Sequence, residues 1–155
     1  MPTTDPLARA LDLAARNVAA GGGPFGAVVV LPDGSMVDGV NRVTLDNDPT
    51  AHAEVVAIRA ASARLGTFDL SGCSLYSSCE PCPMCGAAAL WARLDTVVFA
   101  ADRHDAAAAG FDDSAFYALF ERPGGEWPTV LRHEASPDRL APFEAWARFA
   151  ERTEY

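Results

Sequence analysis

The sequence predicts an α/β fold, a three-layer α/β/α sandwich around a mixed sheet of about five strands. Short apolar runs rich in β-branched residues recur along the 155 residues, and such runs are typical of buried strands. Segments with helical spacing of apolar residues alternate with them, which favours parallel strands joined by helices. The chain length and a hydrophobic content of 50% suit one domain with a substantial core.

The first part of the chain predicts a helix and a hairpin. Asp5 and Pro6 have the pattern of an N-cap and a first helical residue, so a helix is expected over residues 6–20. A run of glycines then ends it. The apolar run 25–31 and the segment 36–40 flank a Pro-Asp-Gly-Ser turn and predict two antiparallel strands.

The rest of the chain predicts alternating strands and helices. Strands are expected around residues 75–76 and over 95–101 and 129–133, and helices over 50–65, from Pro81 onward, and over 114–121 and 137–151. Asp48 or Thr50 is expected to cap the helix over 50–65.

Composition excludes some classes of function. The net charge is −9 and the basic residues, all arginine, form no cluster, so a nucleic acid is a poor partner. No apolar run is long enough to span a membrane, and the N-terminus lacks the pattern of a signal peptide. Four cysteines, two of them expected on a metal, fit a reducing cytoplasm better than a disulfide scaffold.

Two short motifs predict a catalytic zinc site. The first contains His52 and Glu54, and the second contains Cys82 and Cys85 at the start of a predicted helix. One imidazole and two thiolates make three protein ligands, which leaves the fourth position of a tetrahedral zinc ion open for water. Glu54 is then the natural general acid and base. Such H-x-E and P-C-x-x-C motifs are typical of zinc-dependent nucleobase deaminases.

Other interpretations of these residues remain open. The cysteine pair is also compatible with buried apolar packing, with a redox pair, or with half of a structural zinc site, in which Cys73 and Cys79 would complete a four-cysteine cluster. Glu54 distinguishes a catalytic zinc site from a structural one, because a structural site does not require a neighbouring carboxylate. Glu80 is either a second proton relay or only a charge at a helix end.

With these motifs the chain resembles bacterial guanine deaminases of the cytidine deaminase superfamily. The resemblance runs from residue 24 to the C-terminus and covers most of the chain. Its specific parts are NDPTAHAEV at 47–55, SCEPCPMCGAA at 78–88, AGFDDS at 109–114, PFEAWARFA at 142–150 and a terminal Glu154-Tyr155. The zinc motifs belong to the whole superfamily, whereas the FDD loop and the tail narrow the match to the guanine deaminase branch.

The resemblance implies a cytidine deaminase-like fold and a homodimer in which the C-terminal segment, about 137–155, is exchanged between subunits. It implies that zinc is held by His52, Cys82 and Cys85 and that Glu54 carries protons. The implied substrate-binding residues are Asn41, Phe25, Ala53, Trp91, Asp113 and Tyr155, with Glu144 as a further relay candidate. Structural roles are the alternatives for several of them: a turn for Asn41, the core for Trp91, a helix cap for Asp113 and a frayed end for Tyr155.

The expected reaction is the hydrolysis of guanine to xanthine and ammonia. The alternatives are a deaminase of cytosine, a nucleoside or an aminotriazine, because pocket shape decides the substrate. A tRNA adenosine deaminase shares the zinc motifs but fits the acidic composition poorly. A zinc module without turnover is the alternative outside enzymes.

Overall fold

In the computed structural model, residues 5–111, 113–123 and 126–155 are described. The chain divides into two units, residues 1–117 and 118–155, and each is described by itself. Residue 112 of the FDD loop and the two glycines at 124–125, where a break was predicted, lie outside the described residues.

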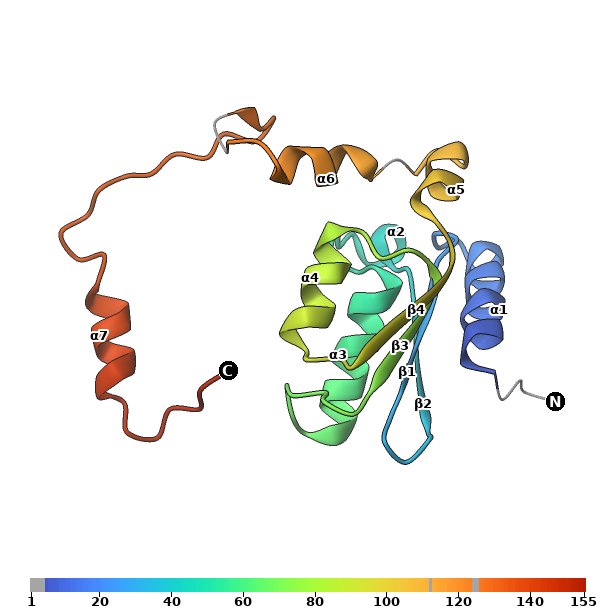
Figure 1. Ribbon diagram of the computed structural model, residues 1–155, viewed down its shortest axis with the longest axis horizontal. Coiled ribbons are helices and arrows are strands. Elements are labelled where there is room, and N and C mark those ends of the chain that lie inside the picture. The colour runs from blue at the N-terminus through green and yellow to red at the C-terminus, as the bar shows by residue number, and fades with distance from the viewer. Residues whose placement is uncertain (1–4, 112, 124–125) are drawn as a thin grey trace. The chain divides into compact units, whose positions relative to one another are not determined.

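The first unit contains a four-stranded mixed sheet with the strand order β2-β1-β3-β4 (Figure 1). The strands are β1 (Gly26–Val30), β2 (Met36–Val40), β3 (Ser74–Cys79) and β4 (Thr96–Ala101). β1 pairs antiparallel with both β2 and β3, whereas β3 pairs parallel with β4. The predicted hairpin and the parallel pairing after it are therefore confirmed.

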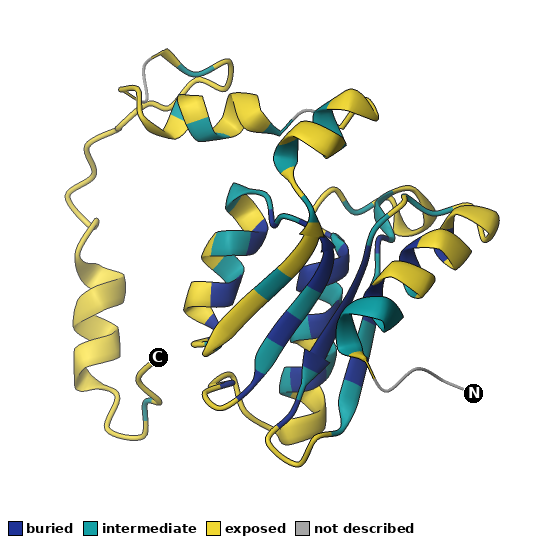
Figure 2. Ribbon diagram, turned by 45° about the vertical axis from the view of Figure 1, so that its right-hand side comes forward, coloured by how far each residue is buried: buried dark blue, intermediate teal, exposed yellow. Residues whose placement is uncertain are grey.

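Helices cover both faces of this sheet (Figure 1). α1 (Pro6–Ala19) packs against β1 and β3, and α3 (Ala53–Leu65) packs against β1 and β2 with α4 (Pro83–Trp91) beside it. The burial pattern follows these layers, with the deepest residues on the central strands and on the helix faces turned to them (Figure 2). The three-layer α/β/α architecture predicted from the sequence is confirmed.

Local chemistry explains where the helices begin. Asp5 caps α1 as predicted, since its side chain accepts a hydrogen bond from the backbone N–H of Leu7 at 3.0 Å. The prediction that Asp48 or Thr50 caps α3 was wrong. The carboxylate of Asp48 instead accepts the N–H and the hydroxyl of Thr50 in a turn, and α3 begins only after His52. α4 likewise begins at Pro83 rather than at Pro81, as was predicted.

Three short helices complete the elements up to residue 120. α2 (Val43–Asp46) lies between β2 and α3, and α5 (Arg103–Ala108) and α6 (Ser114–Phe120) follow β4. α2 lies within a segment predicted to be a polar loop. Its four residues carry no apolar periodicity, so the sequence contains no signal for it.

The second unit contains α7 (Ala141–Arg148), which is shorter than the predicted helix over 137–151. None of the described residues from 118 onward is buried within the single chain. The predicted fifth strand over residues 129–133 was wrong, because these residues are in no strand of the described chain. A strand needs a hydrogen-bonded neighbour, which apolar composition alone does not supply.

Candidate active site

Two helix N-termini bring the predicted zinc ligands together. His52 is the N-cap residue of α3, and Cys82 is the N-cap residue of α4. Cys85 follows in the first turn of α4. Free backbone N–H groups and the positive end of the helix dipole favour thiolates at such positions.

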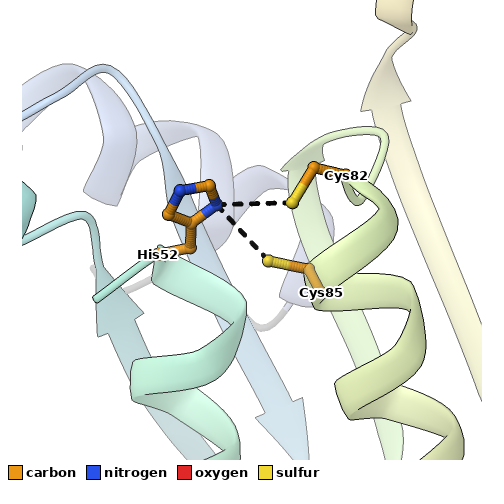
Figure 3. A group of neighbouring side chains, drawn as sticks. All are labelled: His52, Cys82 and Cys85. Carbon is orange, nitrogen blue, oxygen red and sulfur yellow. Dashed lines mark hydrogen bonds between the residues drawn. The ribbon is translucent and has the colours of Figure 1, made fainter. Parts of the chain in front are cut away.

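The ligand atoms have the spacing that a tetrahedral zinc ion requires. The Nδ1 atom of His52 lies 3.5 Å from the Sγ atom of Cys82 and 3.5 Å from that of Cys85 (Figure 3). Zinc–nitrogen bonds near 2.05 Å and zinc–sulfur bonds near 2.3 Å at the tetrahedral angle would separate the two atoms by about 3.6 Å. The three atoms lie within 4.8 Å of one another. His52, Cys82 and Cys85 therefore form a candidate zinc site.

Among the described residues this group contains no fourth protein ligand. Cys73 is in the hydrophobic core, and Cys79 is not part of the group. Burial raises the pKa of Cys79 to about 11, which keeps it a neutral thiol near pH 7. A site with three protein ligands has the composition of a catalytic zinc centre rather than that of a closed structural one.

Glu54 lies buried beside the zinc ligands, with only 6% of its surface exposed. Its Oε2 atom accepts a hydrogen bond from the Sγ atom of Cys85 at 3.5 Å, and its Oε1 atom accepts the hydroxyl of Ser77 at 3.2 Å. Burial raises the pKa of Glu54. A carboxyl group with a raised pKa is suited to accept and return protons at neutral pH.

The protonation states of the ligand cluster follow from its contacts. The thiol of Cys85 and the imidazole of His52 lower the pKa of Cys82 by hydrogen bonding, whereas the pKa of Cys85 is raised by its position beside Cys82. The hydrogen bond to Cys82 in turn raises the pKa of His52. The thiolate is therefore favoured at Cys82.

A cavity of about 340 Å³ opens next to this cluster, within the usual size range of small-molecule sites. Its lining comes from the loop after α1, the segment around α2, the N-terminus of α3, the end of β3 and the segment around α5. The lining residues are Gly23, Phe25, Asn41, Val43, Thr44, His52, Glu54, Cys79, Glu80, Cys82, Ala106, Phe111 and Asp113.

The cavity combines aromatic walls with polar groups. The rings of Phe25 and Phe111 meet edge to face with centroids 5.0 Å apart. The Oδ1 atom of Asp113 is buried and has no hydrogen-bond partner in the described chain. Burial also raises the pKa of Asp113. A buried acceptor without a hydrogen bond is destabilising, and a bound ligand can supply the missing donor.

Glu80 lines the cavity but is held by an arginine. Both of its carboxylate oxygens accept hydrogen bonds from Arg103, with a shortest distance of 2.6 Å. These hydrogen bonds lower the pKa of Glu80. The guanidinium carbon of Arg103 also lies 3.9 Å from the ring centroid of Tyr117, whose hydroxyl donates to the carbonyl of Pro81 at 2.6 Å. This network ties the segment before Cys82 to the helices that follow β4.

The structure does not bring all the predicted substrate-binding residues to the cavity. Ala53 is fully buried in the core, and Trp91, at the end of α4, is 70% exposed and absent from the lining. Glu144 and Tyr155 belong to the second unit, where Glu144 pairs with Arg148 at 3.8 Å and Tyr155 packs edge to face with Trp146. The roles expected for these residues stay predictions.

Several lining or supporting residues were not singled out from the sequence. Ser77, Val43 and Thr44 belong to no motif, and only the alternation of β3 could have placed Ser77 on the face turned to α3. Phe111 lies within the FDD segment, but nothing in the sequence indicated its contact with Phe25.

Comparisons with known proteins agree with this geometry. Residues 4–101 match the family model of the cytidine and deoxycytidylate deaminase zinc-binding region. The chain is 50% identical to the guanine deaminase of Bacillus subtilis (strain 168) over 150 residues, which is 96% of each chain. The X-ray structure of guanine deaminase from Bacillus subtilis matches with a TM-score of 0.94 and covers 100% of this chain and 99% of the other.

More distant relatives are similar over most of this chain. A solved structure of guanine deaminase from Nitrosomonas europaea matches at 39% identity with a TM-score of 0.66, over 70% of this chain and 63% of the other. A tRNA-specific adenosine deaminase of Haemophilus influenzae is 37% identical over 133 residues, 82% of this chain and 75% of the other. The zinc ligands, their spacing and these matches together show that the chain belongs to the cytidine and deoxycytidylate deaminase family of zinc-binding proteins.

Proposed function

We propose that the chain is a zinc-dependent aminohydrolase that converts guanine and water to xanthine and ammonia. The observation that carries the proposal is the position of Glu54, buried and hydrogen-bonded beside a ligand set with no fourth protein ligand in the described chain. The similarity to guanine deaminases over almost the whole chain supports guanine as the substrate.

His52, Cys82 and Cys85 would hold the metal, which when bound supplies a Lewis acid and lowers the pKa of water to about 7. Glu54 takes a proton from the attacking water and gives it to the ring nitrogen next to C2. The C–O bond forms at C2. Glu54 then takes the second water proton from the new C2 hydroxyl and gives it to the exocyclic amine, and the C–N bond breaks to release ammonia. One carboxylate thus acts as base and then as acid.

The cavity walls suit a flat heterocycle with polar edges. Phe25 and Phe111 offer aromatic surfaces to the base, and the unpartnered Oδ1 of Asp113 can accept a hydrogen bond from a ring N–H. Asn41 can donate one through its side-chain amide. Glu80 is paired with Arg103, so we assign the proton transfers to Glu54 alone.

We further propose that the enzyme is a homodimer whose C-terminal segment covers the partner and closes the partner's cavity. β4 lies at an edge of the described sheet and exposes Phe99 and Val97, and the second unit exposes Phe143, Trp146 and Phe149. Exposed apolar surface of this extent is typical of an association site. The family resemblance implies that the C-terminal segment is exchanged between subunits. We therefore expect a second copy of the chain to cover this apolar surface.

A cytoplasmic location fits this assignment, because thiolate ligands persist in a reducing compartment and all four cysteines are free. No described helix is both long and apolar enough to cross a membrane.

Ammonia release from a panel of substrates tests the proposed function. The purified zinc protein is incubated with guanine, adenine, cytosine, guanosine, cytidine and a tRNA anticodon stem-loop. We expect guanine to be turned over with the highest kcat/KM, and removal of zinc by a chelator to abolish ammonia release. Preference for cytosine, a nucleoside or the RNA would contradict the guanine assignment.

A further inference from the structure

We propose that Asn17 is a positioning residue that orients Asn41 for binding the base. The inference rests on the proposed function, in which Asn41 donates to the substrate from the cavity wall. Asn17 belongs to α1 and does not line the cavity, so it would act only through its neighbours.

Asn17 is buried in a place where its carboxamide needs partners. It is 6% exposed and lies near the C-terminal end of α1. Asparagine is a poor residue inside a helix, and a buried amide without hydrogen bonds is destabilising. A buried asparagine at this place is therefore tolerated only if its amide finds hydrogen-bond partners.

Both hydrogens of the Asn17 amide are used on the cavity wall. Its Nδ2 atom donates to the carbonyl of Gly23 at 2.8 Å and to the carbonyl of Asn41 at 2.8 Å. Gly23 and Asn41 both line the cavity. A Cβ atom on Gly22 would collide with the Asn17 carboxamide, so the glycine allows the loop to approach it closely.

The same contacts hold the backbone of Asn41, from which its side chain projects. The backbone N–H of Asn41 donates to the carbonyl of Phe25 at 3.0 Å, and the backbone carbonyl of Asn41 accepts the hydrogen bond from Asn17. Its side-chain Oδ1 atom accepts the N–H of Val43 at 3.2 Å. The Nδ2 atom of Asn41 makes no hydrogen bond within the described chain, and it is thereby left as a donor for a ligand in the cavity. Asn17 thus secures the backbone from which this donor projects.

The substitution Asn17→Asp tests this assignment. Aspartate keeps the shape of the side chain but cannot donate, so its carboxylate would repel the carbonyls of Gly23 and Asn41. We expect the KM for guanine to rise about 10-fold or more, the order of one lost buried hydrogen bond. We expect kcat to stay within about threefold and zinc to remain at one ion per chain, because the effect is on substrate binding. Asn17→Ser, which is smaller and leaves room for water, serves if the aspartate variant does not fold.

A double-mutant cycle with Asn41→Ala separates positioning from general support of the fold. If Asn17 acts through Asn41, Asn17→Asp raises KM in the wild-type background and changes it little in the Asn41→Ala background. Asp38→Asn is the matched control. It removes the carboxylate charge that pairs with Arg9, and this ion pair also joins α1 to the sheet, at β2. We expect this control to leave KM unchanged.

Three results would overturn the proposal: an equal KM increase in both backgrounds, a wild-type KM for Asn41→Ala, or the same KM increase in the Asp38→Asn control. A failure of the proposed function is distinguishable, because it appears in the wild-type protein as absence of turnover of guanine. The same KM ratios are then measured on whichever substrate of the panel is turned over. If none is, both proposals fail.

Discussion

His52 presents its Nδ1 atom to both thiols, and its place at a helix N-terminus lets it share the site with Glu54. As the N-cap residue of α3 it has an extended backbone, with φ −68° and ψ 152°, while Glu54 is already in the first helical turn. The change of backbone conformation between the two residues lets side chains two positions apart reach one site. Residues two apart within a helix would diverge.

Loss of one zinc ligand should remove the metal. We expect Cys82→Ala to retain much less than one zinc ion per chain, and to melt at a lower temperature because the site joins the N-termini of α3 and α4. Metal analysis and a thermal melt of the purified variant measure both effects. Cys73→Ala is the matched control: it also removes a buried thiol, but from the core, and should keep full zinc occupancy. Full occupancy in Cys82→Ala would exclude Cys82 as a ligand.

At this scale the sequence predicted that the three candidate ligands come together, but not which residues surround them. His52, Cys82 and Cys85 belong to spaced motifs with a chemical reason for each position. Asn17 and Ser77 are isolated polar residues whose partners lie 24 and 23 positions away. Such contacts depend on how helices pack on the sheet, which spacing along the chain does not encode.

α3 carries the first zinc ligand, and its distance from the sheet depends on one glycine of β2. A Cβ atom on Gly39 would collide with the carbonyl oxygen of Ala53 and the backbone N–H of Ala57. The first turn of α3 therefore lies directly on β2, which determines where His52 and Glu54 are placed.

Gly39→Ala should push α3 away from β2. We expect a loss of about 1–3 kcal/mol of unfolding free energy, the usual cost of overpacking, together with weaker zinc binding. Urea denaturation and zinc titration measure these effects. Gly86→Ala, in α4 with nothing within 4 Å of the added Cβ, should be neutral or should stabilise by up to about 1 kcal/mol. If Gly39→Ala were as stable as Gly86→Ala, close packing of α3 would not position the site.

Elements were predictable where one local signal dominated. The N-cap of α1 and the hairpin of β1 and β2 follow from turn and capping residues. The start of α3 was placed too early because Asp48 closes its own turn with Thr50. The strand expected over 129–133 failed because strand formation also needs a partner, which no composition rule reveals.

The two units differ in how completely each can bury apolar surface. The first has a continuous core beneath α3, whereas the described residues of the second make local contacts, such as that of Phe120 with Trp127 at a centroid distance of 5.1 Å. A segment with so little of its own core is stable only when it packs on something else. This imbalance supports the proposed dimer.

Removal of the last two residues, Glu154 and Tyr155, tests the tail as a lid. If the tail closes the cavity, guanine turnover should collapse while zinc content and melting temperature barely change, because a lid excludes water from the reaction. Steady-state kinetics on the truncated protein measure this. Tyr155→Phe is the companion variant, since it keeps the ring and the terminal carboxylate and removes only the hydroxyl. Unchanged turnover after truncation would make the tail structural.

The central claim, that Glu54 carries the protons of a zinc-dependent deamination, is tested most directly by xanthine formation from guanine by zinc-loaded Glu54→Gln. Glutamine keeps the size and a hydrogen-bond acceptor toward Ser77 but cannot exchange a proton. We predict one zinc per chain, an unchanged fold, and a kcat lowered by at least about 10²–10⁴-fold, the usual contribution of general acid–base catalysis. A zinc-loaded, folded Glu54→Gln variant that forms xanthine at nearly the wild-type rate would contradict the claim.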